Sequence, residues 1–428
     1  MTTKSGRSAW RLTFSSLVLL FIASLIAYSV DVLTEHALQQ LDGRMYQLLV
    51  ASGPRKPTPR FTAVITLDPP RQQTMLNVCR QRGLLGELIR ATAELGPAVI
   101  VVDKYFGQEC HSEEIETRAL RRAVHDVSRS VPIVVGRIID DPLALQLRLS
   151  PSLDLDAGDR IAEGIVNTDE DIRRLPLGWL VGPTTEPTPT LSIAAALAYD
   201  PLLLDKVPAL RNLIKRGEHP YIAFLDPHDV EKITYSGRDI LCSSTIGNQM
   251  KAPLECGERA SSSVERLAYL RNRIVVIGEK SPHLDVHPSV VGSVSGFTLQ
   301  ANYIEAVLDG RYLRAGHRGW NYAAGLLLYF ILHWIIVAHR IALRETSGWR
   351  VPGLLLRALG LVLAILVGGF GTLYLIVMHL GWFVDPVRVG FVVIVFKLTE
   401  LLLAKTGLAE PNAVRKHYRR LRHRKATV

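Results

Sequence analysis

The sequence has few of the residues and motifs that mark disulfide-rich, metal-binding or catalytic proteins. It contains only four Cys in 428 residues, which is too few for a disulfide scaffold, and no CxxC pair that would indicate a zinc site. No P-loop, GxGxxG or HExxH motif occurs, and the serines at 261–263 lack a G-x-S-x-G elbow. We therefore expect no enzyme activity, no cofactor and no metal.

Apolar residues, in contrast, are plentiful. A hydrophobic fraction of 48% excludes a mainly disordered chain. The ordinary counts of 32 Gly and 23 Pro exclude collagen-like and low-complexity classes. Because the mean hydropathy is positive, the composition indicates membrane segments.

Four apolar runs are predicted to span a membrane. They cover 12–30, 320–338, 354–380 and 387–404. No convincing small-x-small cleavage site follows the first run, so an uncleaved anchor is favoured over a signal peptide. The fourth run is weaker because it carries Arg388, Lys397 and Glu400. We predict one span, a large segment at 31–318, and then three spans.

Basic residues beside these runs predict their orientation. The segments 1–11, 339–353 and 405–428 together hold 14 Lys and Arg against two acids. Short basic segments stay in the cytoplasm, so we place all three segments and both termini there. Residues 354–404 carry a net charge of +1, and the total of +10 then leaves −3 for 31–318. This acidic charge disfavours nucleic-acid binding.

Two further features suggest partners. The tail segment RKHYRRLRHRK at 415–425 holds seven Lys and Arg. It is interpreted either as a surface that adheres to anionic membrane lipids or as a docking peptide for a separate cytoplasmic output protein. The glycine-rich run at 368–371 allows close helix packing, within a bundle or in a homodimer.

All four cysteines, Cys79, Cys110, Cys242 and Cys256, lie within the segment placed outside the cytoplasm. An even number in an oxidising compartment suggests up to two disulfides. The pairing of 79 with 110 and of 242 with 256 joins cysteines that are close in sequence. Buried thiols are the alternative.

After an amphipathic helix at 31–50, the large segment alternates between strand and helix patterns. Strand-like runs lie at 61–67, 98–102, 131–139 and 273–277, and helix-like stretches at about 83–95, 112–129, 190–199 and 297–308. Near-continuous apolar strands separated by helices predict an α/β fold, in which helices cover both faces of a mostly parallel sheet. The less regular region 140–260 is expected to add hairpins.

Three acids lie near the carboxyl ends of predicted strands, where ligands of such sheets usually bind. They are Asp68, Asp103 and Asp285. Capping of a turn or helix is the alternative role for each of them.

The loop that holds Asp285 also contains His283 and His287. In an extended segment the three side chains would point to one side, which is an arrangement that suits divalent metals. An ordinary polar loop is the favoured interpretation, so the prediction of no metal stands.

Six segments together carry a family resemblance. They are RFTAVITLD (60–68), LGELIRATAELGPAVIVVDKYF (85–106), GIVNTDEDIRRLPL (164–177), TLSIAAALAY (190–199), LRNRIVVIGEKSPHLDVHP (270–288) and SGFTLQANYIEAVLDGRYLR (295–314). In order and spacing they resemble the CHASE2 domain, an extracytoplasmic sensory module of bacterial signalling proteins. The resemblance implies a sensor of the bacterial inner membrane with its large domain in the periplasm. It also adds Asn302 to the candidate ligand-binding residues.

The chain departs from the family pattern at three places. The segment VCRQRG (78–83) stands where the family has a Trp-Pro-Trp-like segment, and Gln300 stands where it usually has His. If these positions line a ligand pocket, its contents differ here. The family's last span usually leads to a cyclase or kinase module, for which 405–428 is too short. We therefore expect a sensor that signals through a separate partner; a non-signalling envelope scaffold or assembly factor is the alternative.

Overall fold

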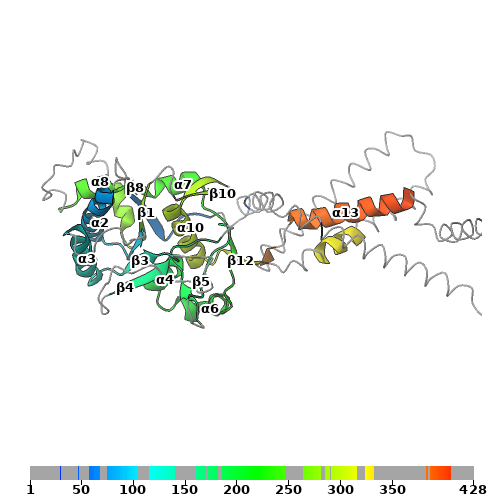
Figure 1. Cartoon of the computed structure of the whole chain (residues 1–428), viewed down its shortest axis with the longest axis horizontal. Coiled ribbons are helices and arrows are strands. Elements are labelled where there is room, and N and C mark those ends of the chain that lie inside the picture. The colour runs from blue at the N-terminus through cyan, green and yellow to red at the C-terminus, as the bar shows by residue number, and fades with distance from the viewer. Residues whose placement is uncertain are drawn as a thin grey trace, which may run out of the picture. The chain divides into compact units, whose positions relative to one another are not determined.

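The computed structural model describes two parts of the chain. The described residues are Ser29, Gln47, 57–67, 75–104, 115–139, 160–169, 172–181, 186–245, 264–280, 285–289, 291–315, 323–331, 382–383 and 386–405. They fall into two compact units, one of residues 47–314 and one of residues 1–46 with 315–428 (Figure 1).

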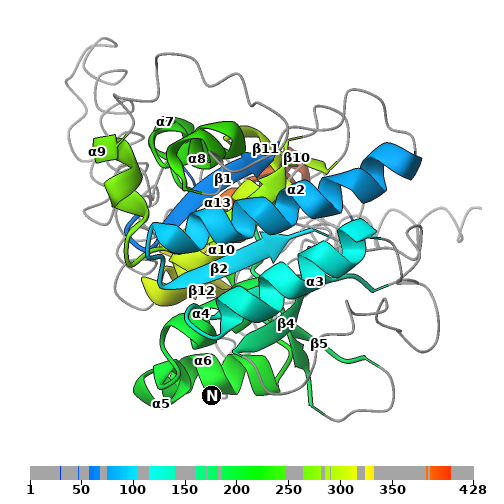
Figure 2. The ribbon, with the colours of Figure 1, turned by 90° about the vertical axis from the view of Figure 1, so that its left-hand side faces the viewer.

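A six-stranded sheet lies at the centre of the 47–314 unit (Figure 2). In spatial order its strands are β4 (Ile161–Ile165), β3 (Ile133–Arg137), β2 (Val99–Asp103), β9 (Ile274–Glu279), β1 (Thr62–Leu67) and β8 (Thr234–Ser236). All neighbouring pairs are parallel, so the carboxyl ends of the strands share one edge. The late strand β9 lies between β1 and β2, where Val276 pairs with Val64 on one side and with Val101 on the other.

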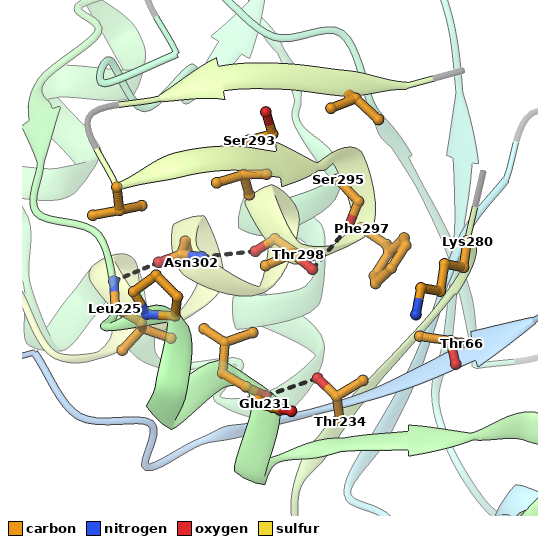
Figure 3. A pocket seen from close by; sticks show the side chains of 15 residues that line it. Thr66, Leu225, Glu231, Thr234, Lys280, Ser293, Ser295, Phe297, Thr298 and Asn302 are labelled. Atoms are coloured by element: carbon orange, nitrogen blue, oxygen red, sulfur yellow. Dashed lines mark hydrogen bonds between the residues drawn. The ribbon is translucent and has the colours of Figure 1, made fainter. Parts of the chain in front are cut away.

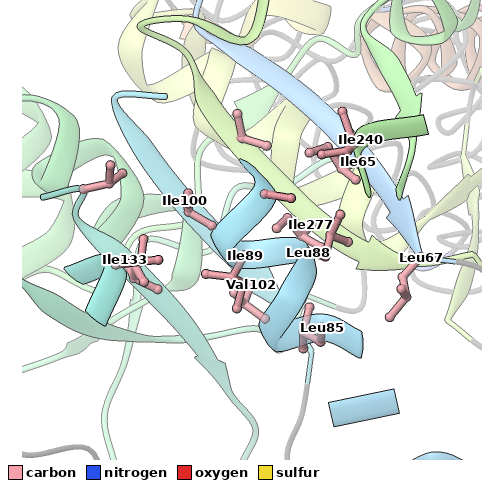
Figure 4. Close-up of a cluster of buried hydrophobic side chains, with 14 of the residues drawn as sticks. Ile65, Leu67, Leu85, Leu88, Ile89, Ile100, Val102, Ile133, Ile240 and Ile277 are labelled. Carbon is pink, nitrogen blue, oxygen red and sulfur yellow. The ribbon is translucent and has the colours of Figure 1, made fainter. Parts of the chain in front are cut away.

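Helices cover both faces of this sheet. The helices α2 (Met75–Glu94), α3 (Ile115–Ser128) and α8 (Gly237–Ser243) lie on one face, and α4 (Leu191–Tyr199) and α10 (Gly296–Leu308) lie on the other. Alternate strand residues point to opposite faces. Ile65 and Ile100 therefore belong to the cluster that contains Leu88 and Ile89 of α2 (Figure 4). Val64 and Val101 pack in the cluster that contains residues of α4 and α10. Each fully buried Val or Ile contributes roughly 1.5–3 kcal/mol to stability.

A further apolar layer packs on the outer side of α4 and α10. Leu175 and Leu177 contribute to it, as do Leu213 of α6 and Tyr303 of α10. The Tyr303 hydroxyl donates to the Ile172 carbonyl at 2.8 Å. The remaining elements are β5 (Gly178–Trp179), β6 (Thr188–Pro189), α5 (Leu203–Lys206), α6 (Pro208–Lys215), β7 (Tyr221–Ile222), α7 (Pro227–Lys232), α9 (Val264–Leu267), η3 (Ala268–Leu270), β10 (Val286–Ser289), β11 (Gly292–Ser295), β12 (Tyr312–Ala315), β13 (Trp382–Phe383) and α13 (Pro386–Lys405).

The predicted α/β fold is confirmed. The strand-like runs of the sequence form β1, β2, β3 and β9, and the helix-like stretches form α2, α3, α4 and α10. The antiparallel pair β5–β6 is a hairpin of the kind expected within 140–260. The sequence pattern missed β4 and β8, because β4 mixes polar and apolar residues and β8 is only three residues long.

Glu305 joins α10 to the beginning of β1. Its side chain is fully buried, and its Oε1 accepts the Phe61 N–H at 2.7 Å, the Thr62 N–H at 2.6 Å and the Thr62 hydroxyl at 2.8 Å. Both carboxylate oxygens accept the Arg60 N–H, at 3.0 and 3.1 Å. Burial raises the pKa of Glu305, and these hydrogen bonds act against that rise. We call this arrangement, Glu305 with residues 60–62, the Glu305 clamp.

The second unit contains two described helical segments. The predicted span at 387–404 is helical as α13, and residues 323–331 are helical within the predicted span 320–338. They pack together through Tyr329, Val392 and Phe396. Within the described part of the chain, however, no helix is both long and apolar enough to cross a membrane. The predicted spans at 12–30 and 354–380 lie outside the described residues, apart from Ser29.

The Glu305 clamp predicts a graded loss of stability. Glu305→Ala removes the acceptor of three backbone N–H groups, of which that of Thr62 is buried. We expect it to lower the free energy of unfolding by about 2–4 kcal/mol. Glu305→Gln keeps one acceptor oxygen and should lower the free energy of unfolding by about 1–2 kcal/mol. Urea denaturation of the full chain in detergent measures both.

A surface glutamate provides the control for this series. Glu218 is 41% exposed and pairs with Arg216 only at 3.4 Å, so Glu218→Ala should change stability by less than about 0.5 kcal/mol. If Glu305→Ala were no more destabilising than Glu218→Ala, the clamp would not hold β1 as described.

Candidate ligand-binding site

A polar cleft opens at the carboxyl ends of the parallel strands. It has a volume of about 560 Å³, and its lining includes residues at or just beyond the ends of β2, β3, β4 and β9, together with the hairpin β10–β11 and the first turns of α10. Open α/β sheets bind ligands at this edge. The cleft therefore lies where the strand-end acids of the sequence predicted a site.

Asp103 is the last residue of β2 and lines this cleft. Its backbone pairs with Gly278 of β9, which sets its side chain at the sheet edge. Burial, followed by repulsion from the Asp285 carboxylate, raises the pKa of Asp103 to about 8. Near neutral pH this carboxyl group therefore holds a proton.

Asp285 approaches the cleft from the loop before β10. Its backbone is left-handed, with φ of 58°, and its carbonyl accepts the Gly296 N–H at 3.0 Å. Its carboxylate occupies the space that a Cβ on residue 296 would need, so glycine is required at the start of α10. One carboxylate oxygen lies 3.0 Å from Nε2 of His287.

Lys104 forms an ion pair across two strands at the floor of the cleft. Its ammonium lies 2.8 Å from the Glu279 carboxylate at the end of β9 and donates to Gln81 Oε1 at 2.9 Å. The Lys104 and Glu279 side chains are only 15% and 26% exposed. The positive charge of Lys104 is therefore already balanced within the protein.

Gln300 is a buried amide of α10 with one unsatisfied atom. It is 3% exposed, lines the cleft, and donates through Nε2 to the Val166 carbonyl at 3.1 Å. Because that carbonyl needs a donor, the amide orientation is set and Oε1 faces away from Val166. Among the described residues, Oε1 has no hydrogen-bond partner. A buried acceptor without a donor is costly, so this atom suits a ligand that brings one.

Comparison with family models identifies the fold family. The model of the CHASE2 domain matches residues 17–339, which is most of the chain. The chain belongs to the CHASE2 family. This is a family of extracytoplasmic sensory domains, and the resemblance in the sequence motifs is thereby confirmed. No curated protein and no solved structure matches the chain significantly.

The structure of this CHASE2 domain places only some of the predicted site residues in the polar cleft. Asp103 and Asp285 are brought together at the cleft. Asn302 is held by structural bonds: its Oδ1 accepts the Leu225 N–H at 2.7 Å and its Nδ2 donates to the Thr298 carbonyl at 2.9 Å. Both polar atoms are thus engaged within the fold. Asp68 lies outside the described residues.

A second cavity is lined by Asn302 and by other residues of α10 and β11 (Figure 3). Its volume is about 730 Å³, and its lining includes Val230, Val294 and Phe297. It is larger than the polar cleft, and about half of its lining side chains are apolar. We place the site in the polar cleft, since that is where Asp103, Asp285 and the unsatisfied Gln300 Oε1 occur.

The metal and disulfide predictions stay predictions. Among the described residues, no group of three His, Cys, Asp or Glu side chains could hold a metal ion, and His283 lies outside them. Cys242 is disulfide-bonded, but no described side chain identifies its partner. The pairing of 242 with 256 and of 79 with 110 therefore stays a prediction.

Lys104 and Glu279 were not predicted from the sequence to be members of the site. Each directly follows or ends an apolar strand, which was an available signal. Their pairing depends on β9 lying beside β2, and the sequence did not predict that neighbourhood.

The raised pKa of Asp103 predicts how stability depends on pH. This group ionises near its ordinary value of 3.8 in the unfolded chain and near 8 in the folded one. Between these values the folded protein holds a proton that the unfolded chain has lost, so stability falls as pH rises. Asp103→Asn removes this pH dependence. The free energy of unfolding of the variant, relative to that of the wild type, should therefore rise by roughly 1–3 kcal/mol between about pH 5 and pH 8 and stay constant above pH 8. Urea denaturation across this pH range measures the gain.

Asp126 provides the matched control, because its side chain is 59% exposed. Asp126→Asn should follow the wild-type curve at every pH. Parallel curves for Asp103→Asn and the wild type would contradict the buried, proton-holding state of Asp103.

Proposed function

We propose that the protein is a sensor of the bacterial inner membrane whose periplasmic CHASE2 domain binds a small molecule in the polar cleft. In this proposal the signal passes to a separate cytoplasmic partner. Two findings support it: the family match over residues 17–339 and the polar cleft at the ligand-binding edge of the sheet. The proposal rests mainly on Asp103, which lines the cleft with Asp285 and has a raised pKa. Groups with strongly shifted pKa values cluster at functional sites.

The helix α10 offers a route from the cleft to the rest of the chain. Gly296 and Gln300, near its beginning, line the cleft, and Glu305, near its end, holds residues 60–62. The 13 residues of α10 span about 20 Å as a rigid rod. A ligand that shifts the beginning of α10 would therefore move the Glu305 clamp.

The clamp lies where the chain enters and leaves the domain. Residues 60–62 follow the N-terminal segment, and α10 continues into β12, which precedes the apolar run at 320–338. Arg60 also pairs with Asp309 at 3.5 Å, so a second contact joins entry and exit. A shift of α10 would thus act on both connections to the proposed membrane anchors.

The segment 221–224 contacts the chain both where it enters and where it leaves the domain. Gln47, on the entering segment, donates through Nε2 to the Phe224 carbonyl at 3.1 Å and accepts the Phe224 N–H at 3.3 Å. On the leaving segment, Tyr312 and Leu313 of β12 pair with β7. Both connections are therefore bound to the short segment 221–224.

Membrane anchoring and the cytoplasmic tail complete the proposal. The apolar runs outside 31–318 would hold the domain at the membrane, with the basic segments on the cytoplasmic side. The tail at 415–425 would touch anionic lipids and also contact the output partner. A homodimer through the 368–371 region is compatible with this arrangement.

Capture of the partner in living cells tests this function. A photo-crosslinking amino acid in place of Tyr418 should yield one recurring cytoplasmic protein, identified by mass spectrometry of the adducts. The same substitution at Ser8, in the other basic segment, serves as the control and should not capture that protein. Adducts with lipid alone at residue 418 would contradict signalling through the tail and favour the envelope-scaffold alternative.

A further inference from the structure

The polar groups of the cleft differ in whether they are already paired. Lys104 is bound to Glu279 and Gln81. Asn167 accepts the Ile139 N–H through Oδ1 at 2.7 Å. These groups are engaged within the protein, so they do not select a ligand by charge.

The groups that remain are mainly acceptors. They are the Asp103 carboxyl and Gln300 Oε1, which has no hydrogen-bond partner among the described residues. The Asp285 carboxylate is a further acceptor of the lining, with one of its oxygens 3.0 Å from Nε2 of His287. The Thr168 hydroxyl, also in the lining, can either donate or accept. A ligand that satisfies this set must bring hydrogen-bond donors.

The beginning of α10 does not provide an anion site. Helix N-termini bind anions readily, but here the Asp285 carboxylate lies against Gly296 and the Asp285 carbonyl accepts its N–H. The protein's own acid thus occupies the position that a ligand carboxylate or phosphate would take. Apart from Lys104 and His287, the described lining contains no cationic side chain, and His287 lies against Asp285.

We infer that the ligand of this cleft carries a protonated amino group, which lies between Asp103 and Asp285 and donates to Gln300 Oε1. This inference rests on the proposed sensor function of the same cleft. The volume of about 560 Å³ suits a small organic amine with room for further groups. The amine supplies a positive charge for the two aspartates and hydrogen-bond donors for Gln300 Oε1.

Calorimetric titration of the full-length protein in lipid nanodiscs tests the inference. The probes are butylamine, putrescine and spermidine, with butan-1-ol and butyrate as the neutral and anionic counterparts of butylamine. We expect saturable binding of at least one amine at about pH 8, and none of the alcohol or the carboxylate. A matching rise in melting temperature provides a second readout.

Variants then locate the amine. Asp103→Asn and Asp285→Asn should each weaken amine binding about 10-fold or more, since each removes a charged acceptor. Gln300→Leu should weaken it by a smaller factor of about 3 to 5, because it removes a neutral acceptor. Asp126→Asn, which lies outside the cleft lining, should bind as the wild type does.

Two results would overturn the inference: no saturable amine binding, or amine binding that is unchanged in both aspartate variants. Binding of butyrate that is strengthened in those variants would show that the cleft takes anions and would also overturn the inference. That outcome would leave the sensor function in place, since partner capture at residue 418 tests the sensor function separately.

Discussion

The Glu305 carboxylate is the interaction on which the arrangement of this domain depends. It supplies acceptors for the backbone N–H groups of Arg60, Phe61 and Thr62, at the point where the chain enters the sheet. A buried acid is costly unless it is hydrogen-bonded in this way. Because Glu305 lies on α10, the helix that leads out of the domain is tied to the strand that leads in.

A second electrostatic constraint lies near the beginning of α10, in the polar cleft. Asp103 is kept in a partly buried position beside Asp285, where its pKa is raised to about 8, and Gln300 Oε1 has no donor among the described residues. Groups of this kind reduce the stability of a folded protein unless they are paired. In the proposed function, a ligand with matching charge and donors offsets this cost. The helix α10 thus connects the candidate site with a clamp that contacts the entering segment of the chain.

Much of the fold could be predicted from the sequence, because the parallel strands are covered on both faces and read as uninterrupted apolar runs. Asp103 and Asp285 were also predicted, from their places after such runs. The role of Glu305 could not be, because an acid within a helix usually faces solvent. Asn302 was assigned to ligand binding through the family motif, and its structural bonds to Leu225 and Thr298 depend on packing that no local pattern shows.

Amide hydrogen exchange tests the coupling between cleft and clamp most directly. The full-length protein in nanodiscs would be followed by mass spectrometry, with and without the amine that binds most tightly. The account predicts that saturation of the cleft changes the exchange rates of Phe61 and Thr62, whose N–H groups donate to Glu305, although they lie at the opposite end of α10. Unchanged rates at these two amides, with the amine bound, would contradict it.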